Sequence, residues 1–489
     1  MKISLSFRCI ALLGLGLSQA NAQQAPDLTR LLDTSGNLSR VQEVRWTARG
    51  DSFDPAQTIV AGSRSRHISS YSVEGSWHPG GDTNYRWTLN IHYPFVSTWE
   101  YQESMDSSGN GEIEGADGFR PSAAGALPPA RVGARAKYLS MTMPALVMAD
   151  ARQVTPIAGQ PNGYEFVAMD TQWRVHLDVT TGLPMRLSTT ENDPLFGTVE
   201  TTMQYSDWRG NDGVLMPGQL VYRVDGQLIQ QEQRNDLTVS LASRGRTVDH
   251  SPALDVPAYS RGWNMAHWFL RRIALGGPAD TDQSYPVELL EVGEGVYQVL
   301  GSSHHSLVIE AADGLVVVDA PLYPTRSAAV LETLAERWPD KPVQRLILTH
   351  HHYDHSGGVA AFAAAGIPIV IHAANAEFLA AALAKQGLGA VPIRGVGDQA
   401  ELSIGGLAIG LYDVPTSHVA GMLMVYLPDQ RLIFNSDLYS PGRETQHQLW
   451  ASELLQAIRF LRLPVDRLVG AHGRGSGTLE ELERVVGVD

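Results

Sequence analysis

Residues 349–358 have the sequence Thr-His-His-His-Tyr-Asp-His-Ser-Gly-Gly, and they directly follow the apolar run 343–348. Four histidines and one aspartate thus lie within six consecutive residues. Neutral imidazole and carboxylate are ligands that zinc accepts in catalytic sites. A core strand that ends in a polar loop gives such ligands a rigid support that faces solvent. We therefore predict a metal site here, in preference to a histidine-rich surface loop with incidental metal affinity.

The spacing within this cluster divides its side chains between two positions. Side chains two residues apart in extended backbone point to the same side, so His350 and His352 can bind one ion together. Asp354 and His355 follow where the chain turns, and they can reach a second ion a few ångströms away. We expect the glycine pair 357–358 to allow the sharp turn into the next helix.

Three further candidate ligands lie downstream of the cluster. Each lies at the exit of a predicted strand: His418 comes after residues 414–417 at the end of a strand-like segment, Asp437 ends the apolar run 431–436, and His472 follows residues 467–471. Any one of them alone would more often be a surface or capping residue. Because the same context recurs three times, we expect all three to join the cluster.

At this point the sequence resembles a known family. Residues 349–355 are similar to the His-x-His-x-Asp-His signature of the metallo-β-lactamase fold superfamily. The three downstream residues fall where later ligands of that superfamily are expected, and Asp319 resembles its early strand-end aspartate. The resemblance covers about residues 290–485. It implies an α/β fold, an αββα sandwich with two zinc ions in a groove at one sheet edge.

The resemblance also implies a role for each ligand. It assigns His350, His352 and His418 to the first ion, and Asp354, His355 and His472 to the second. Asp437 would bridge the two ions, as in glyoxalase-II-like and lactonase-like members. True β-lactamases of this fold generally lack the bridging aspartate, which counts against an antibiotic-destroying role.

The function implied is that of a hydrolase with two zinc ions, with iron or manganese as alternative metals. A metal-bridging hydroxide would attack an ester, thioester, lactone, amide or phosphoester bond of a small-molecule substrate, with Asp354 and Asp437 taking part in catalysis. Residues that closely follow the ligands are candidates for contacting substrate: Tyr439, Arg443, His447 and Arg474. Other nearby histidines are predicted to be packed, structural or at the surface: His304, His305, His351 and His372.

The rest of the sequence limits the classes of protein that are possible. The chain has 489 residues, of which 43% are hydrophobic and 18% charged, and this composition is globular. The net charge of −15 gives no basic footprint for nucleic acid or anionic lipid. A chain of this length is too long for one ordinary core, so we expect two or more domains.

The N-terminus resembles a secretory signal peptide. Lys2 and Arg8 precede or begin an apolar run that is too short to span a bilayer, and Ala20-Asn21-Ala22 fits the small-x-small cleavage rule. We predict a signal peptide over 1–22, a periplasmic or secreted protein, and no integral membrane segment after cleavage. The single cysteine, Cys9, leaves with the signal, which excludes disulfides and thiolate ligands from the mature chain.

Hydrophobic patterns divide the mature chain into two domains and a connector. Residues 23–245 contain alternating runs separated by turn residues, which predicts an antiparallel β-rich domain with helices over 27–35 and 145–151. Residues 106–129 are rich in Gly, Ser, Ala and Pro and predict a mobile loop. Residues 246–285 predict a connector, and residues 286–489 alternate strands and helices, as in α/β layering.

The N-terminal domain resembles, more faintly, the half-barrel of periplasmic lipoprotein carriers. Residues 178–184, 205–208 and 213–217 carry this likeness. It is a likeness of fold and does not transfer function. Two alternative functions stay open: a periplasmic ligand-binding protein whose metal domain is not catalytic, and a di-iron oxidoreductase of the same fold.

Overall fold

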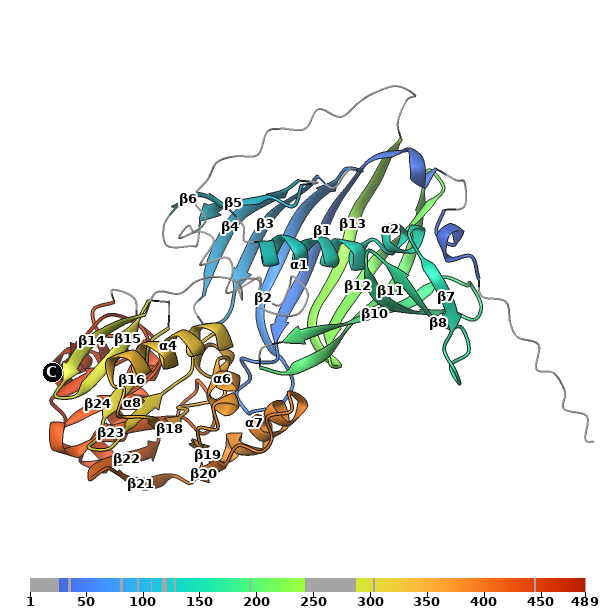
Figure 1. Ribbon diagram of the computed structural model, residues 1–489. Helices are drawn as coiled ribbons and strands as arrows, with labels where there is room; N and C mark the ends of the chain where they lie inside the picture. The colour runs from blue at the N-terminus through green and yellow to red at the C-terminus, as the bar shows by residue number, and fades with distance from the viewer. Residues whose placement is uncertain are drawn as a thin grey trace, which may run out of the picture.

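The computed structural model describes residues 26–33, 37–79, 82–94, 96–106, 108–116, 121–126, 129–193, 195–241, 287–301, 304–443 and 446–488. The predicted signal peptide 1–22 and connector 246–285 lie outside these residues. Two parts of the chain are seen in Figure 1, a large curved sheet and a layered α/β domain. The last strand of the first part ends at Leu241, and the first strand of the second begins at Glu288.

The N-terminal part is one antiparallel sheet, which confirms the predicted class of this domain. Its strands follow the order β6-β5-β4-β3-β2-β1-β13-β12-β11-β10-β9-β8-β7. Apolar and polar residues alternate along these strands, so that one face is buried. The strand bounds are β1 Val41–Asp54, β2 Arg66–Trp77, β3 Thr83–Ile91, β4 Ser97–Met105, β5 Gly111–Ala116, β6 Pro121–Ala126, β7 Arg152–Pro156, β8 Gly163–Ala168, β9 Thr171–Leu177, β10 Pro184–Asp193, β11 Gly197–Asn211, β12 Val214–Val224 and β13 Gln227–Leu241.

Two helices cover the buried face of this sheet. Helix α1, Pro129–Thr142, lies across the strands, and α2, Pro144–Ala149, follows it (Figure 1). Helix α2 confirms the prediction over 145–151. The helix predicted over 27–35 is wrong in extent: its described residues form one 3-10 turn, η1 Leu28–Arg30, because Asp33 pairs with Val214 at the sheet. A second 3-10 turn, η2, covers Leu38–Arg40.

The predicted mobile loop over 106–129 is also wrong. Its described residues form the edge hairpin β5–β6 and the start of α1, with β5 paired to β4 from Glu100↔Ala116 to Met105↔Gly111. Gly, Ser and Ala are poor strand formers, but an existing strand edge supplies the backbone partners that override this weak propensity. The amino-acid composition of residues 106–129 was therefore a poor guide to their structure.

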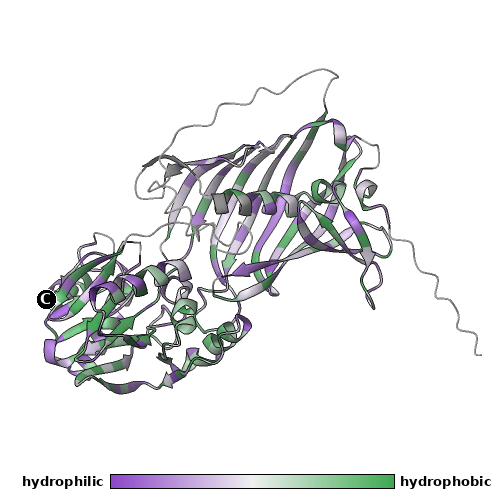
Figure 2. Cartoon of the chain, in the orientation of Figure 1, coloured by the Kyte–Doolittle hydropathy of each residue, from purple (hydrophilic) through white to green (hydrophobic). Residues whose placement is uncertain are grey.

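The C-terminal domain has two sheets packed face to face, with helices outside. Apolar side chains of both sheets form the central core, seen as green strands in Figure 2. The first sheet has strands β14 Glu288–Gly293, β15 Val296–Leu300, β16 Ser306–Glu310, β17 Leu315–Val318, β18 Val343–Ile347, β19 Ile369–His372 and β20 Ile393–Val396. The second has β21 Gln399–Ile404, β22 Leu407–Asp413, β23 Leu423–Leu427, β24 Leu432–Phe434, β25 Arg467–Val469 and β26 Ser476–Gly477.

Helices complete the αββα arrangement that the resemblance implied. The first sheet packs against α4, α6 and α7, and the second against α8 and α9. Their bounds are α4 Pro324–Arg337, α5 Tyr353–Ser356, α6 Val359–Ala364, α7 Ala373–Lys385, η3 Pro428–Gln430, α8 Gln448–Leu461 and α9 Leu479–Val486. Within the described ranges, no helix is both long and apolar enough to span a membrane.

The strand that carries the histidine cluster lies inside its sheet. β18 pairs in parallel with β17 on one side and with β19 on the other. β17 is Leu-Val-Val-Val and is buried along its whole length, as expected for a parallel strand covered on both faces. Loops at the carboxyl ends of such strands are rigidly held and open to ligands.

Candidate metal centre

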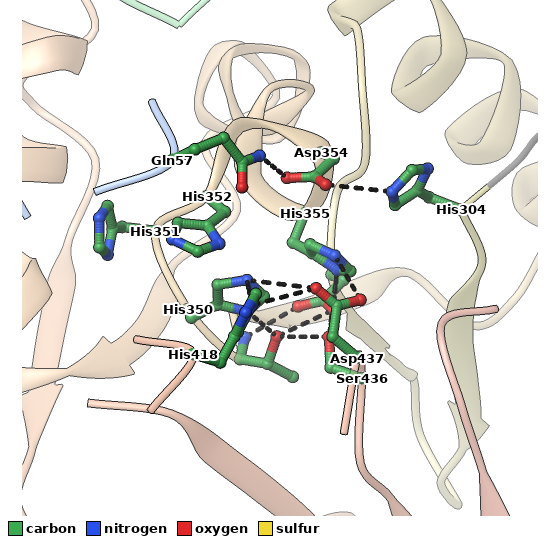
Figure 3. Close-up of polar contacts among 12 residues, drawn as sticks. Gln57, His304, His350, His351, His352, Asp354, His355, His418, Ser436 and Asp437 are labelled. Atoms are coloured by element: carbon green, nitrogen blue, oxygen red, sulfur yellow. Dashed lines mark hydrogen bonds and ion pairs between the residues drawn. The ribbon is translucent and has the colours of Figure 1, made fainter. Parts of the chain in front are cut away.

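The predicted ligands converge from four loops, although His350 and His472 are 122 positions apart in the chain. His350 and His352 follow β18, and Asp354 and His355 lie on the short helix α5. His418 lies between β22 and β23, Asp437 follows β24, and His472 follows β25. Figure 3 shows the side chains of the first five and of Asp437 around one centre.

Three histidines form the first group. Ring nitrogens of His350, His352 and His418 all lie within 4.8 Å of one another. Nε2 of His350 and Nε2 of His418 are 3.3 Å apart. Two nitrogens bound to one tetrahedral zinc ion at about 2.0–2.1 Å are about 3.3–3.4 Å apart. His350 and His418 therefore have the spacing of two ligands of one zinc ion, and His352 lies within reach of the same position.

Asp437 lies between the first group and a second one. Its Oδ2 is 3.2 Å from Nε2 of His418 and 3.8 Å from Nε2 of His350. Its Oδ1 is 2.9 Å from Nε2 of His355 and 3.2 Å from Nε2 of His472. The two carboxylate oxygens thus face different histidine pairs, which is the arrangement of a carboxylate shared by two cations.

The second group contains a residue that sequence reasoning placed elsewhere. Ligand atoms of His304, His355 and His472 lie within 4.8 Å of one another. His304 was predicted to be structural or at the surface, yet it is buried among the candidate ligands. It lies four positions after the end of β15, in a loop that could have been found by the same search of strand ends that found His418.

Asp354 is held by two neighbours. Its Oδ2 is 3.1 Å from Nε2 of His304, and its Oδ1 accepts a hydrogen bond of 2.5 Å from Gln57. Among the described residues, however, Asp354 belongs to none of the groups of three ligands whose atoms all lie within 4.8 Å of one another. It borders the second group through His304.

A network below the ligands fixes the orientation of His355. Its Nδ1 is 3.1 Å from Oδ2 of Asp319, whose other oxygen accepts a hydrogen bond from the backbone N–H of Thr349. The hydroxyls of Thr349 and Ser436 also donate to Asp319. These bonds hold Asp319 at a φ of +63°, a left-handed conformation that is costly for an L-residue. The strand-end aspartate therefore positions a ligand.

The glycines at 357–358 serve close packing. A Cβ on Gly357 would lie 2.1 Å from the carbonyl oxygen of Leu322, and one on Gly358 would lie 2.1 Å from Oγ of Ser327. Their φ values, −62° and −91°, are open to any residue. The predicted role of these glycines in a sharp turn is therefore wrong, because their backbone is ordinary and it is the lack of space that requires glycine.

Burial and charge set the protonation of the centre. Burial and the neighbouring histidines lower the pKa of His350 and His352 well below the ordinary value, so both imidazoles are neutral. Burial opposes protonation of His355 too, but the carboxylates of Asp437 and Asp319 outweigh it and raise its pKa. Burial would raise the pKa of Asp437, yet the surrounding histidines hold it well below the ordinary value.

The donor atoms fit a metal pair. Nδ1 of His352 is buried, and among the described residues it has no hydrogen-bond partner. Nε2 of His355 and Oδ1 of Asp437 are close, but they do not form a hydrogen bond of acceptable geometry. Buried polar atoms without partners are costly, and one cation at each of the two groups would satisfy all three atoms. Imidazole and carboxylate donors of this kind suit zinc, and also iron or manganese.

The candidate substrate residues lie in different surroundings. Tyr439 is buried in an apolar core, Arg443 is exposed, and Arg474 pairs with Glu288 at the surface. The ring of His447 stacks on Trp450, and that tryptophan ring lies 4.2 Å from the His418 ring. Of these residues, His447 is linked to the ligand group by the contacts just described.

His351 and His372 have the structural positions that were expected. His351 is buried, and its Nε2 lies 3.0 Å from Oγ1 of Thr58. His372 caps α7 through its Nδ1, and it also groups with Asp398 and Asp413 away from the main cluster. Sequence reasoning missed three N-terminal residues, Gln57, Thr58 and Tyr93, which contact the ligands directly.

Part of the chain is similar to known proteins. Residues 300–472 match the model of the metallo-beta-lactamase superfamily. A 2,4-dinitroanisole O-demethylase subunit alpha from Nocardioides sp. (strain JS1661) is 28% identical over 206 residues, which are 41% of this chain and 62% of that protein. A linear primary-alkylsulfatase from Pseudomonas sp. is 36% identical over 72 residues, 14% of this chain. The chain thus spans 62% of the length of the first relative and 11% of the second.

Solved structures of metallo-beta-lactamases are also similar to part of this chain. A metallo-beta-lactamase from Pontibacter korlensis is 21% identical, with a TM-score of 0.35, over 42% of this chain and 98% of that one. A mono-zinc metallo-beta-lactamase from Pseudomonas aeruginosa is 20% identical, with a TM-score of 0.33, over 42% of this chain and 94% of that one. The residues that match the family model do not include the N-terminal β-domain. Residues 300–472 therefore form a metallo-beta-lactamase superfamily domain with a histidine-rich candidate metal site.

Proposed function

We propose that this chain is a metal-dependent hydrolase with a dinuclear zinc centre, acting on a small-molecule ester, thioester, lactone, amide or phosphoester. The observation that carries the proposal is the position of Asp437 between two histidine groups. One carboxylate oxygen faces His350 and His418, and the other faces His355 and His472. A mononuclear site would need only one of these groups.

When bound, two zinc ions activate water as a nucleophile and polarise the oxygen of the scissile group. The chain contributes the orientation of the centre and its exclusion from bulk water. His350 and His355 have fully buried side chains, whereas the side chain of His472 is 20% exposed. A substrate therefore reaches the centre from the His472 side.

The names of the relatives guide the choice of substrates to test. One is named as a demethylase subunit for an aryl methyl ether, and another as an alkylsulfatase. A substrate panel should therefore include 2,4-dinitroanisole and a primary alkyl sulfate together with ester, lactone, thioester, phosphodiester and lactam probes. The bridging position of Asp437 favours the groups other than lactam.

The decisive experiment combines metal analysis with this panel. We expect protein purified from its native host to hold two zinc ions per chain, and to lose turnover of its substrate after chelation. Two iron atoms and a redox activity would support the oxidoreductase alternative. Full turnover after complete metal removal would refute the hydrolase, and so would protein that holds no metal when purified from its native host and only binds ligands.

Export is a separate part of the proposal. It rests on the charged and apolar residues before Ala22 and on the absence of cysteine after Cys9. Mass spectrometry of the mature protein should find Gln23 at the N-terminus. A mature chain that retains residues 1–22 would contradict this part and leave the hydrolase untouched.

A further inference from the structure

Two loops of the N-terminal β-domain reach the candidate metal centre. The loop between β1 and β2 is joined by backbone hydrogen bonds to both sides of the ligand cluster. The N–H of Tyr353 donates to the carbonyl oxygen of Ala56 at 3.1 Å, and the N–H of Ala420 donates to that of Ile59 at 2.7 Å. Ala56 is itself buried in the core beneath α4, α6 and α7. This loop is therefore built into the C-terminal domain.

The first ligand that this loop holds is His352. Its Nε2 lies 2.9 Å from the carbonyl oxygen of Thr58. A carbonyl only accepts, so Nε2 carries the proton and Nδ1 carries the lone pair. That Nδ1 is the buried atom without a hydrogen-bond partner in the first group. Thr58 therefore selects the tautomer in which His352 can bind a cation.

Tyr93, from the loop after β3, holds a second ligand. Its hydroxyl oxygen lies 3.0 Å from Nδ1 of His418, whose Nε2 faces His350. With Nε2 given to a cation, Nδ1 carries the proton and donates to the phenol oxygen. Arg66 packs over the Tyr93 ring at 3.9 Å and also donates to the carbonyl oxygen of His418. Ring and imidazole are thus fixed together.

The third contact is made by Gln57, seen above the ligands in Figure 3. Its side-chain amide donates to Oδ1 of Asp354, and His304 contacts the other oxygen. Gln57 is 1% exposed, so this hydrogen bond has no competition from solvent. The amide fixes the carboxylate of Asp354 in one orientation.

We propose that the N-terminal β-domain is a structural part of the metal centre, with Gln57, Thr58 and Tyr93 as positioning residues for Asp354, His352 and His418. Outer partners of this kind fix the tautomer and orientation of metal ligands, and their loss lowers metal affinity about 10–100-fold. The inference rests on the proposed metal centre. It gives the N-terminal domain a role that requires no ligand of its own.

Tyr93→Phe in the full-length chain tests the proposal, because it removes the hydroxyl and keeps the ring beneath Arg66. We expect zinc affinity, measured by competition with a chromophoric chelator, to fall about 10–100-fold. We also expect the visible absorption bands of the cobalt(II)-substituted protein to shift, since they report ligand geometry. Circular dichroism checks that the fold is kept.

Tyr205→Phe is the matched control. Tyr205 is also a buried tyrosine of the β-domain, and its hydroxyl donates to the carbonyl oxygen of Met141, away from the ligands. The control should keep wild-type zinc affinity and cobalt bands. Gln57→Ala is a second test that does not depend on Tyr93, and it should weaken the second metal more than the first.

The outcomes separate this inference from the proposed function. Wild-type affinity and unchanged cobalt bands in folded Tyr93→Phe would overturn the inference, and the metal centre would stand. The same result for Gln57→Ala would overturn the role of Gln57, including where Tyr93→Phe does not fold. A wild-type chain that binds no zinc or cobalt would overturn both the inference and the proposed function.

Discussion

Nε2 of His304 lies 3.1 Å from a carboxylate oxygen of Asp354, and the His304 ring centroid lies 4.3 Å from that of His472. His304 thus joins Asp354 to the second histidine group. It can serve this group either as a direct donor or as the partner that orients Asp354. In both roles His304 supports the second metal position, and it is not a member of the first histidine group.

His304→Ala should therefore remove one metal selectively. We expect zinc content after dialysis to fall from two ions per chain towards one, because the histidines of the first group keep their contacts. Metal analysis by mass spectrometry measures this. His67→Ala is the control, since its side chain is 43% exposed in the β-domain. Retention of both ions in His304→Ala would exclude both roles.

Asp437→Asn should abolish turnover with little loss of fold. The amide keeps the size of the side chain but removes the negative charge that faces four histidines. We expect kcat to fall about 10²–10³-fold, as it does when a group that stabilises developing charge is removed. His352→Ala should behave in the same way.

Asp466→Asn is the control for this substitution. Asp466 pairs with Arg431, and both side chains are more than half exposed. It should keep wild-type kinetics and thermal stability. Unchanged kcat in both Asp437→Asn and His352→Ala would remove these residues from the active site.

Metal removal should lower the thermal stability of the C-terminal domain. A ligand that binds only the folded state stabilises it by about 2.7 kcal/mol when its free concentration is 100 times its Kd. Two further effects of metal removal act in the same direction. Buried donor atoms such as Nδ1 of His352 are left without a partner, and the negative charge of Asp437 is no longer balanced by the cations. Scanning calorimetry with and without chelator measures the change.

Restoring zinc supplies the control for metal removal. The melting temperature and turnover should recover together when zinc is added, and magnesium at the same concentration should restore neither. A melting temperature that does not depend on zinc would show that the histidine groups bind no ion in the folded protein.

Much of the metal centre could be predicted from the sequence because its determinants are local. His350 and His352 follow one core strand, and the exits of three other strands supply His418, Asp437 and His472. Periodicity locates the strand ends, and sheet topology brings neighbouring ends together.

The contribution of the N-terminal domain could not be predicted in this way. Gln57 and Asp354 are 297 positions apart, and Tyr93 and His418 are 325 apart. No periodicity connects such pairs, because the contact depends on how two separately folded parts dock. The edge hairpin β5–β6 escaped prediction for a related reason: its partner strand, and not its own composition, determines its structure.

A fully buried ion pair should determine the stability of the β-domain. Arg135 on α1 pairs with Glu103 on β4, and both side chains are 0% exposed. The guanidinium also packs 5.2 Å from the centroids of the Tyr85 and Trp87 rings. In the part of the chain that the structure describes, Nε and Nη1 of Arg135 have no hydrogen-bond partner, so Glu103 supplies most of the compensation for its buried charge.

Glu103→Gln should consequently destabilise this domain by about 3–5 kcal/mol, because a buried guanidinium would be left without its anion. Urea unfolding followed by tryptophan fluorescence measures the free energy. The double variant Glu103→Leu with Arg135→Met removes both charges and should be more stable than Glu103→Gln, since well-packed apolar replacements avoid the desolvation cost. The single variants Glu103→Leu and Arg135→Met complete the comparison. If the free energy of unfolding lost in the double variant equals the sum of the losses in these two, the two charges do not depend on each other.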